Sequence, residues 1–271
     1  MPGMPNKPAR TRTRSKASIR QYSAPALEKG IEILELLAEV PGGLALTEIA
    51  ARLKRSMNEV FRIVVVMESH GWLSKDAESW RYSATYHLLE TALRATPAQP
   101  LSAVAAPVME KLAIDTKQSC HLVVRAGGHG LIIQRQENDS LDGGFSLRVG
   151  ANVDLVRSCS GHVLLAFAVP HVFEAIVKQL PRPLGWSMAR LEKRLSEVRR
   201  RGYEMQTSAR TAGVTDVGFP VFGFDGRVAA ALTVPYLTLL DASAPATLNQ
   251  TRDLLRRAAQ KISAGLGWKG K

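Results

Sequence analysis

The chain has 271 residues, which is long for one domain and sufficient for two. Apolar residues make up 45% of it, enough for sizeable cores, yet no run is long and apolar enough to predict a membrane span. The formal net charge of +12 admits nucleic acid as a partner, and two cysteines, Cys120 and Cys159, exclude a disulfide framework and a cysteine metal site.

The positive charge is concentrated at the N-terminus. Residues 1–22 hold six basic residues and no acidic one, and we predict a basic disordered tail there. This tail either adds sequence-independent phosphate contacts or has no binding role. Because it lacks the apolar stretch of a secretory signal, the sequence predicts a reduced, cytoplasmic protein.

Two short amphipathic helices joined by a tight turn are predicted between residues 46 and 71. Thr47 is placed as the N-cap of the first helix. Ser56, with Glu59 three residues later, opens the second as a capping box, and Gly71 suits the left-handed conformation that ends it. The inward positions at helical spacing are Leu46, Ile49, Ala50 and Leu53, then Val60, Ile63, Val64 and Met67.

An apolar helix precedes this pair, and a hairpin follows it. The inward positions of the preceding helix are predicted at Ile31, Leu34, Leu37 and Ala38. Trp72–Ser74 and Trp80–Tyr82 flank a polar turn and indicate a β-hairpin. Three helices followed by a hairpin are typical of a winged helix-turn-helix that binds DNA. The same elements also occur in helical domains that bind no nucleic acid, so the pattern alone leaves both interpretations open.

The rest of the chain predicts a second domain. Helical patterns over residues 86–93 and 101–115 are separated by Pro97 and Pro100, which favours a connector at this point. Strands are expected at Cys120–Val124, Gly130–Arg135, Gly144–Val149, Gly202–Gln206, Gly213–Phe222 and Arg227–Pro235. Helices are expected at Gly161–Ala168, Val172–Gln179, Ser187–Arg201 and Ala246–Ala264. Strands and helices mixed without strict alternation predict an α+β domain around a largely antiparallel sheet.

Taken in order, these segments resemble the IclR family of bacterial transcriptional regulators, from about Ser23 to Leu266. The resemblance lies in ALEKGIEILELLAEVPGGLALTEIA, GWLSKDAESWRYSATYHLLE, VGANVDLVRSCSGHVLLAF, RRRGYE and GVTDVGFPVFGFDGRVAAALTVPY. It implies an α+β architecture in which a winged helix-turn-helix is joined by a linker helix to a GAF-like effector-binding domain. The implied boundaries are a tail over 1–22, a DNA-binding domain over 23–83, a linker helix over 84–100 and an effector-binding domain over 101–271.

The resemblance also implies the partners. Family members usually act as dimers or tetramers on operator DNA and regulate catabolic operons in response to a small molecule. We therefore expect a homodimer or tetramer, double-stranded operator DNA, a small organic acid effector, no cofactor and no membrane. Lys54 and Arg55 stand where the family commonly has a glycine and an apolar residue, so an operator sequence cannot be transferred from relatives.

The second helix of the pair exposes its N-terminal end in this arrangement, which predicts the DNA contacts. Asn58 suits an adenine edge, Arg62 suits guanine or a phosphate, and Ser56 suits a phosphate at the helix N-terminus. Glu59 either accepts a hydrogen bond from cytosine or closes the capping box, and we favour the cap. The expected DNA-binding residues are Lys54, Arg55, Ser56, Met57, Asn58 and Arg62, with Phe61 nearby.

An effector site is predicted in the second domain. In SCSGHVLLAF a small-residue turn leads into a helix, so N–H groups near Ser160 and Gly161 are placed to bind a carboxylate, although a capped turn alone explains the same pattern. The resemblance adds ligand contacts, so that the expected set is Cys159, Ser160, Gly161, Val214, Asp216, Thr233 and Pro235, with Phe145 and Leu147 as weaker candidates for an apolar wall.

Asp216 bears on the effector's chemistry. An ionised carboxylate beside an anionic effector is unfavourable unless a cation compensates it, and the available cations are Arg148, Arg157 and Arg210. Alternatively Asp216 accepts hydrogen bonds from hydroxyl groups. We therefore expect a hydroxylated small organic acid, such as a sugar acid or an aromatic hydroxy-acid.

No catalytic site and no metal site are predicted. Cys120 and His121 are neighbours on a strand and face opposite sides, so the histidine cannot serve the thiol as a base. The chain also lacks a Gly-x-Ser-x-Gly elbow and a phosphate-cradling loop. The alternative function is a ligand-free DNA-binding assembly protein whose C-terminal domain serves oligomerisation only.

Overall fold

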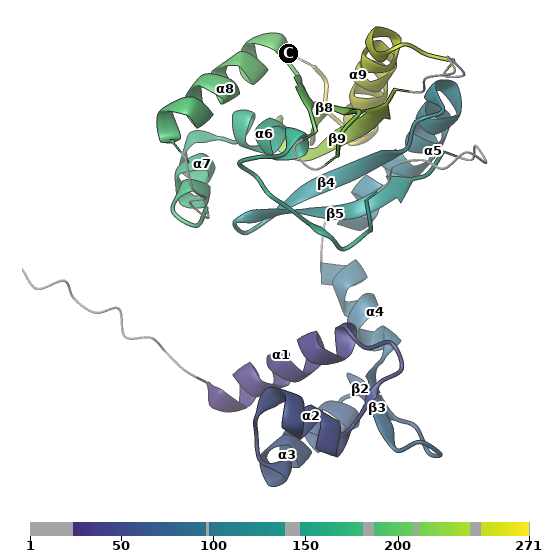
Figure 1. Cartoon of the computed structure of the whole chain (residues 1–271), viewed down its shortest axis with the longest axis vertical. Coiled ribbons are helices and arrows are strands. Elements are labelled where there is room, and N and C mark those ends of the chain that lie inside the picture. The colour runs from purple at the N-terminus through teal and green to yellow at the C-terminus, as the bar shows by residue number, and fades with distance from the viewer. Residues whose placement is uncertain are drawn as a thin grey trace, which may run out of the picture. The chain divides into compact units, whose positions relative to one another are not determined.

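The computed structural model describes residues 24–95, 98–138, 147–180, 187–208, 211–238 and 245–270. They form two compact units that divide after Ala95 (Figure 1), and each is described by itself. The predicted tail over residues 1–22 lies outside the described residues, as do Phe145 and Arg210. Among the described helices, none is long and apolar enough to cross a membrane.

The described part of the N-terminal unit has four helices and a small antiparallel sheet. Its elements are α1 (Pro25–Ala38), β1 (Leu44–Ala45), α2 (Leu46–Leu53), α3 (Met57–Ser69), β2 (Leu73–Lys75), β3 (Arg81–Ala84) and α4 (Tyr86–Ala95). Strand β3 pairs with both β1 and β2. The predicted winged helix-turn-helix is therefore confirmed, with β1 as an additional strand that the sequence analysis missed.

Local hydrogen bonds explain where these helices begin and end. Ser56 Oγ accepts from the Glu59 N–H at 3.3 Å, so Ser56 is the N-cap of α3 as predicted. Gly71 follows α3 with φ +76°, the left-handed conformation expected there. The prediction for Thr47 is wrong, because α2 already begins at Leu46 and its N-cap is Ala45, whose N–H donates to the Glu48 carboxylate at 2.7 Å.

The core of the N-terminal unit corrects one further prediction. Ile31 is 47% exposed and Ala38 is exposed, so neither is an inward position of α1. Leu37 is buried as predicted and Leu34 packs against the core, but the second buried position of α1 is Ile33, which was not predicted. The buried residues of this core are Ile33, Leu37, Leu44, Ile49, Ala50, Val60, Val64, Leu73 and Tyr82.

The C-terminal unit is built on one six-stranded antiparallel sheet in the order β6-β5-β4-β9-β8-β7. Its strands are β4 (Cys120–Ala126), β5 (His129–Gln136), β6 (Asn152–Val153), β7 (Glu204–Thr207), β8 (Val214–Phe222) and β9 (Val228–Leu237). Its helices are α5 (Ala98–Thr116), α6 (Cys159–Ala166), α7 (Pro170–Val177), α8 (Met188–Arg201) and α9 (Leu248–Gly265). The predicted antiparallel α+β domain is confirmed.

Two details of this unit differ from the prediction. The described end of the predicted strand 144–149, residues 147–149, is not in a strand, and the edge strand β6 lies at Asn152–Val153. Pro100 is also not a break between helices, contrary to the prediction. It lies in the first turn of α5, where a missing N–H removes no intrahelical hydrogen bond.

The sheet separates two hydrophobic cores (Figure 1). Helices α5 and α9 cover one face, where Leu232 and Val234 of β9 pack with Leu255. Helices α6, α7 and α8 belong to the other core, which includes Ala231 of β9. Because side chains alternate along a strand, Thr233 shares the face of Ala231, and this second face carries the candidate ligand site.

Candidate functional site

The exposed end of α3 carries the side chains predicted to contact DNA. All six residues are exposed, and they follow one another through the turn before α3 and its first two turns: Lys54, Arg55, Ser56, Met57, Asn58 and Arg62. The Arg55 guanidinium forms an ion pair with Glu32 of α1 at 3.2 Å. Arg62 Nε donates to the Asn58 carbonyl at 3.4 Å, and Arg62 is exposed.

Glu59 is engaged within the N-terminal unit. Its carboxylate forms an ion pair with Lys29 of α1, and the hydrogen bond from that ammonium holds the pKa of Glu59 below its ordinary value, with a smaller contribution from the Ser56 N–H. The main partner of the carboxylate is therefore Lys29, which was not predicted, whereas the Ser56 side chain accepts from the Glu59 N–H as the capping interpretation expects.

A cavity of about 350 Å³ lies at the N-terminus of α6, on the sheet face that α6 covers. Four residues of the predicted effector site line it, namely Cys159, Ser160, Asp216 and Thr233. Leu147 and Arg157, the candidates for an apolar wall and a compensating cation, line it as well. The remaining lining residues are His121, Asn152, Val153, Asp154, Ser158 and Ser208.

Strand register brings the cavity residues of the sheet together. Thr233 lies opposite Gly218 on β8 and opposite His121 on β4, so the three share a face. Asp216, two residues from Gly218, shares that face too. Gly218 lets α6 approach closely, since a Cβ there would lie 3.0 Å from Cys159 Sγ and 3.2 Å from Thr233 Oγ1.

Three predicted effector residues do not line the cavity. Val214 and Pro235 are on the same strand face as Asp216, but both are buried beside it. Gly161 packs against the Leu155 backbone, and its N–H donates to Ser158 Oγ at 2.9 Å. Among the first N–H groups of α6, that of Gly161 is thus occupied, whereas those of Cys159 and Ser160 have no intrahelical acceptor.

The deep wall of the cavity is polar and incompletely hydrogen-bonded. Thr233 is 2% exposed, and its Oγ1 has no hydrogen-bond partner within the part of the chain that the structure describes. Burial lowers the pKa of His121 to about 4, so its imidazole is neutral near pH 7. Burial also raises the pKa of Asp216, although a hydrogen bond with Ser208 opposes that shift.

The rim of the cavity is a hydrogen-bonded turn that leads into α6. Asp154 Oδ1 accepts from the N–H of Val156 at 2.7 Å and from the N–H of Arg157 at 3.2 Å. Gln206 of β7 donates to the Arg157 carbonyl at 2.9 Å. The exposed Arg157 side chain thus stands at the mouth of a rigid turn, where its charge attracts an anion.

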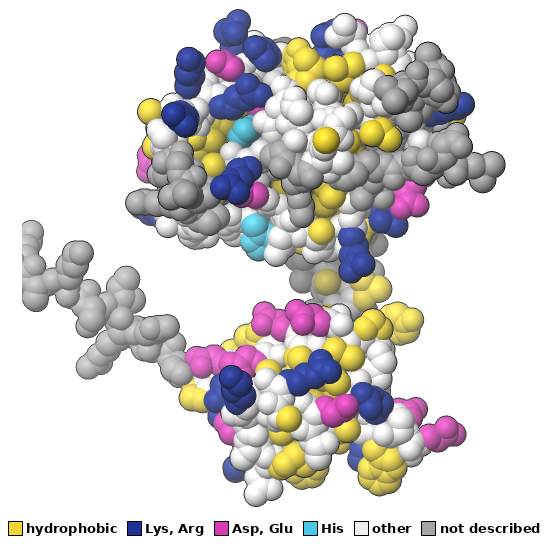
Figure 2. All heavy atoms as spheres, in the orientation of Figure 1, with side chains coloured by type: hydrophobic (Ala, Val, Ile, Leu, Met, Phe, Trp, Pro, Cys, Tyr) yellow, Lys and Arg dark blue, Asp and Glu magenta, His cyan; other side chains and the backbone are white. Residues whose placement is uncertain are grey.

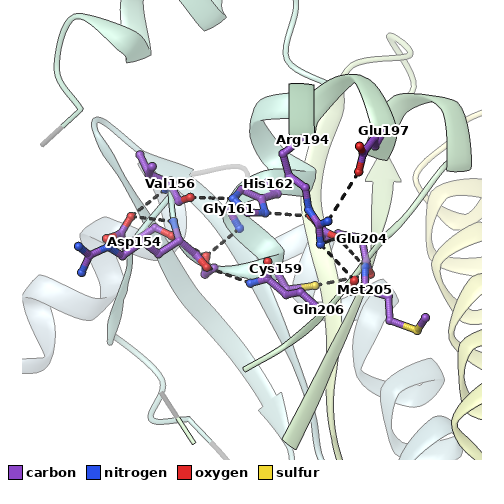
Figure 3. Close-up of polar contacts among 12 residues, drawn as sticks. Asp154, Val156, Cys159, Gly161, His162, Arg194, Glu197, Glu204, Met205 and Gln206 are labelled. Atoms are coloured by element: carbon purple, nitrogen blue, oxygen red, sulfur yellow. Dashed lines mark hydrogen bonds and ion pairs between the residues drawn. The ribbon is translucent and has the colours of Figure 1, made fainter. Parts of the chain in front are cut away.

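A buried ionic network supports this rim (Figure 3). His162 of α6 lies with Nδ1 2.9 Å from Glu204 Oε2 and with Nε2 2.7 Å from the Val156 carbonyl oxygen. Arg194 of α8 donates to both carboxylate oxygens of Glu204 at 2.8 Å. Burial alone would raise the pKa of Glu204, but the hydrogen bonds from His162 and Arg194 outweigh it and lower the pKa.

Comparison with known proteins decides the family. A model of the C-terminal domain of the bacterial transcriptional regulator IclR matches residues 93–264, and a model of the IclR helix-turn-helix domain matches residues 26–77. The chain belongs to the IclR family.

Relatives of known name support this assignment along nearly the whole chain. The transcriptional regulator BhcR of Paracoccus denitrificans is 29% identical, covering 89% of this chain and 87% of that protein. KdgR of Escherichia coli is also 29% identical, covering 91% and 94%. An IclR homologue of Microbacterium hydrocarbonoxydans, solved with 4-hydroxybenzoate, is 26% identical with a TM-score of 0.74, covering 89% of this chain and 98% of that one.

This IclR-type protein is therefore a transcriptional regulator rather than an enzyme, with a DNA-binding N-terminal domain and a ligand-binding C-terminal domain. Six cavity residues were not predicted from the sequence, nor was the Glu204 network; the six are His121, Asn152, Val153, Asp154, Ser158 and Ser208. Strand alternation already placed His121 on the face away from Cys120, which is the one signal that could have assigned it to the cavity.

Proposed function

We propose that this regulator controls a catabolic operon in response to a hydroxylated small organic acid that binds in the cavity beside α6. In this proposal α3 reads operator DNA, residues 84–100 connect the DNA-binding domain to the effector-binding domain, and the protein acts as a homodimer or tetramer. The effector shifts the equilibrium between quaternary arrangements, so that two α3 helices move into or out of operator spacing.

The observation that carries the choice of ligand is the unpartnered Thr233 Oγ1 in the cavity wall. A buried hydroxyl without a hydrogen bond costs roughly 1–3 kcal/mol, which a ligand hydroxyl would recover. Asp216 lies on the same strand face and lines the same cavity. Both groups suit a ligand hydroxyl better than a bare hydrocarbon or a second carboxylate.

Other residues of the cavity lining suit the acid group. Cys159 and Ser160 present the first N–H groups of α6, and Arg157 stands on the adjoining turn. Helix N-termini and guanidinium groups both favour carboxylates. An aromatic hydroxy-acid or a sugar acid carries both a hydroxyl and a carboxylate, so it offers a partner to both sets of groups. The 4-hydroxybenzoate complex of the Microbacterium homologue supports this pairing.

The ligand proposal is tested by screening hydroxylated organic acids, with 4-hydroxybenzoate among them, against their deoxy analogues such as benzoate. A ligand of the folded state raises the melting temperature, and calorimetry then gives its affinity. Thr233→Val should weaken binding of the hydroxylated acid by roughly tenfold and leave the deoxy analogue unchanged. Asp216→Asn should likewise act only on hydroxylated ligands.

A matched control is available in α9. Thr251 is fully buried and its Oγ1 also has no partner among the described residues, but it does not line the cavity. Thr251→Val should leave ligand affinity unchanged. If Thr233→Val and Thr251→Val both bind the hydroxylated acid like the parent, the proposed hydroxyl contact is wrong.

The DNA proposal is tested by gel-shift titration at fixed salt. Duplexes are first selected from a random-sequence pool by the full-length protein. Arg62→Ala should weaken binding of a selected duplex by about tenfold or more, whereas Arg227→Ala, which removes an exposed arginine from the C-terminal domain, should not. Equal affinity of parent and Arg62→Ala would show that this end of α3 does not contact the duplex.

A further inference from the structure

An exposed apolar row lies along α3 beside its polar residues. Met57, Phe61 and Val65, each four residues from the next, are 42%, 50% and 41% exposed. Residues four apart lie on the same side of a helix, and Figure 2 shows hydrophobic side chains at the surface of the N-terminal unit where α3 lies in Figure 1. Scattered apolar residues need no explanation, but a continuous apolar patch usually marks a binding surface.

The charges around this row indicate what covers it. Lys54 and Arg55 precede α3, although Arg55 pairs with Glu32 of α1, and Arg62 follows Phe61 directly, so cationic side chains stand at the N-terminal end of the row and beside it. The nearest acidic side chain on α3, Glu59, is paired with Lys29. Apolar side chains set among cations suit the major groove of DNA, where phosphates line the edges and thymine presents a methyl group.

We propose that Met57 and Phe61 recognise thymines, by packing against thymine C5-methyl groups in the major groove. The inference rests on the proposed function of α3 as the DNA-reading helix. Asn58 and Arg62 hydrogen-bond to base edges or phosphates beside this contact. Met57 and Phe61 are chosen over Val65 because the N-terminal residues of a recognition helix approach the bases most closely.

The distinctive experiment replaces thymine by deoxyuridine, which keeps every hydrogen-bonding group and removes only the methyl. The full-length protein first selects duplexes from a random-sequence pool. Each thymine of a selected duplex is then replaced singly, and affinity is measured by gel shift. Burying one methyl group is worth about 0.8 kcal/mol, so each contacted thymine should show an affinity loss of about fourfold, and other positions should show none.

Two variants tie the effect to the named side chains. In Phe61→Ala and in Met57→Ala the deoxyuridine penalty should disappear at the position that each residue contacts, as a double-mutant cycle requires. Val66→Ala is the matched control, because Val66 is 55% exposed on the same helix but outside the row. Arg62→Ala should weaken binding while the penalty persists. Since Phe61 is half exposed, thermal unfolding of Phe61→Ala should stay close to that of the parent.

Three results would overturn the inference. The first is that deoxyuridine is tolerated at every position. The second is that the affinity penalty persists in both Met57→Ala and Phe61→Ala. The third is that Phe61→Ala changes the sedimentation of the DNA-free protein and leaves the penalty intact, which would assign the row to a protein contact. If the pool yields no enriched duplex, the proposed DNA-reading function of α3 fails. If a duplex is enriched but tolerates deoxyuridine throughout, only the thymine inference fails.

Discussion

The imidazole of His162 lies between two hydrogen-bond acceptors, the Glu204 carboxylate at 2.9 Å and the Val156 carbonyl at 2.7 Å. Both ring nitrogens of His162 thus lie within hydrogen-bond distance of an oxygen atom, so the ring joins α6 to β7 and to the turn before α6. Arg194 binds the same carboxylate. The Glu204 side chain, which is 1% exposed, therefore has the Arg194 guanidinium of α8 as its cationic partner and the His162 ring of α6 as a further hydrogen-bond partner.

Removing the central carboxylate should destabilise the C-terminal unit. Glu204→Gln leaves the Arg194 guanidinium without its carboxylate partner, and the loss of hydrogen bonds to a charged group costs about 1.5–3 kcal/mol. Urea unfolding at pH 7 measures this loss. Glu197→Gln is the control, because Glu197 pairs with Arg194 at 3.7 Å and is partly exposed, so its loss should be below about 1 kcal/mol. Equal urea midpoints for Glu204→Gln and Glu197→Gln would contradict the prediction.

The same network predicts a pH dependence. The pKa of Glu204 is lower in the folded protein than its ordinary value of 4.5. Its contribution to stability is therefore fully present above pH 4.5 and is lost as the pH falls through the lower, folded pKa. Urea midpoints of the parent should fall in this acid window more steeply than those of Glu204→Gln. If the urea midpoints of the parent and of Glu204→Gln fell in parallel on acidification, the Glu204 carboxylate would have the same pKa in the folded and the unfolded protein.

Gly161 is required by the close approach of α6 to the rim turn. A Cβ on Gly161 would lie 2.5 Å from both Cα and the carbonyl oxygen of Leu155. Because backbone atoms cannot rotate away, Gly161→Ala should cost about 2–3 kcal/mol and abolish effector binding. Circular dichroism melting and calorimetry measure the two effects.

Gly30 provides the matched control for that substitution. A Cβ there would meet only Met67 Sδ at 3.7 Å and Ile63 Cγ2 at 3.8 Å, which are ordinary contacts. Gly30→Ala should therefore stabilise α1 by up to about 1 kcal/mol, since glycine loses more conformational freedom on folding. A Gly161→Ala variant that melts like the parent would contradict the close packing of α6 on Leu155.

Local signals explain why the helix-turn-helix could be predicted from sequence. Ser56 and Gly71 act on residues within four positions of themselves, so their roles as N-cap and left-handed C-terminal residue follow from the pattern alone. The phase of α1 was harder to predict, because Ile31 and Ile33 are both apolar and only packing against α3 decides which one is buried. Strand β1, with two residues, is too short to leave a pattern.

The cavity depends on contacts between distant parts of the chain. Asp216 and Thr233 were predicted through the family resemblance and they line the cavity. His121 joins them only because β4 pairs with β9, which places it opposite Thr233. Glu204 meets His162 across 42 positions of sequence, and no local pattern marks a strand glutamate as the partner of a helix histidine. The positions of His121 and Glu204 in the site therefore depend on strand register and on the packing of helices on the sheet, which no local sequence pattern specifies.

Two lysines have the left-handed backbone conformation that favours glycine. Lys54 has φ 53° and Lys117 has φ 49°, and this conformation costs an L-residue about 1 kcal/mol. Lys117 is exposed directly after α5, so Lys117→Gly should raise stability by about 0.5–1 kcal/mol and leave DNA binding unchanged. Lys54→Gly should stabilise the protein by a similar amount but weaken DNA binding. It should also reduce the slope of log affinity against log salt concentration by about one, as expected for the loss of one phosphate contact. Unchanged salt dependence in Lys54→Gly would remove Lys54 from the DNA contacts.

Neither cysteine should react quickly in the native protein. Burial raises the pKa of Cys120 to about 12, and burial together with the nearby Asp216 and Glu204 charges raises the pKa of Cys159 well above its ordinary value. The thiolate is the reactive form, so an aromatic disulfide reagent at pH 8 should label the protein slowly until urea exposes both thiols. Because Cys159 lines the cavity, Asp216→Asn should lower its pKa and speed its labelling, whereas Cys120 should be unaffected. A native Cys159 that reacts as fast as a free thiol, with the reaction abolished in Cys159→Ser, would contradict its burial against β7 and β8.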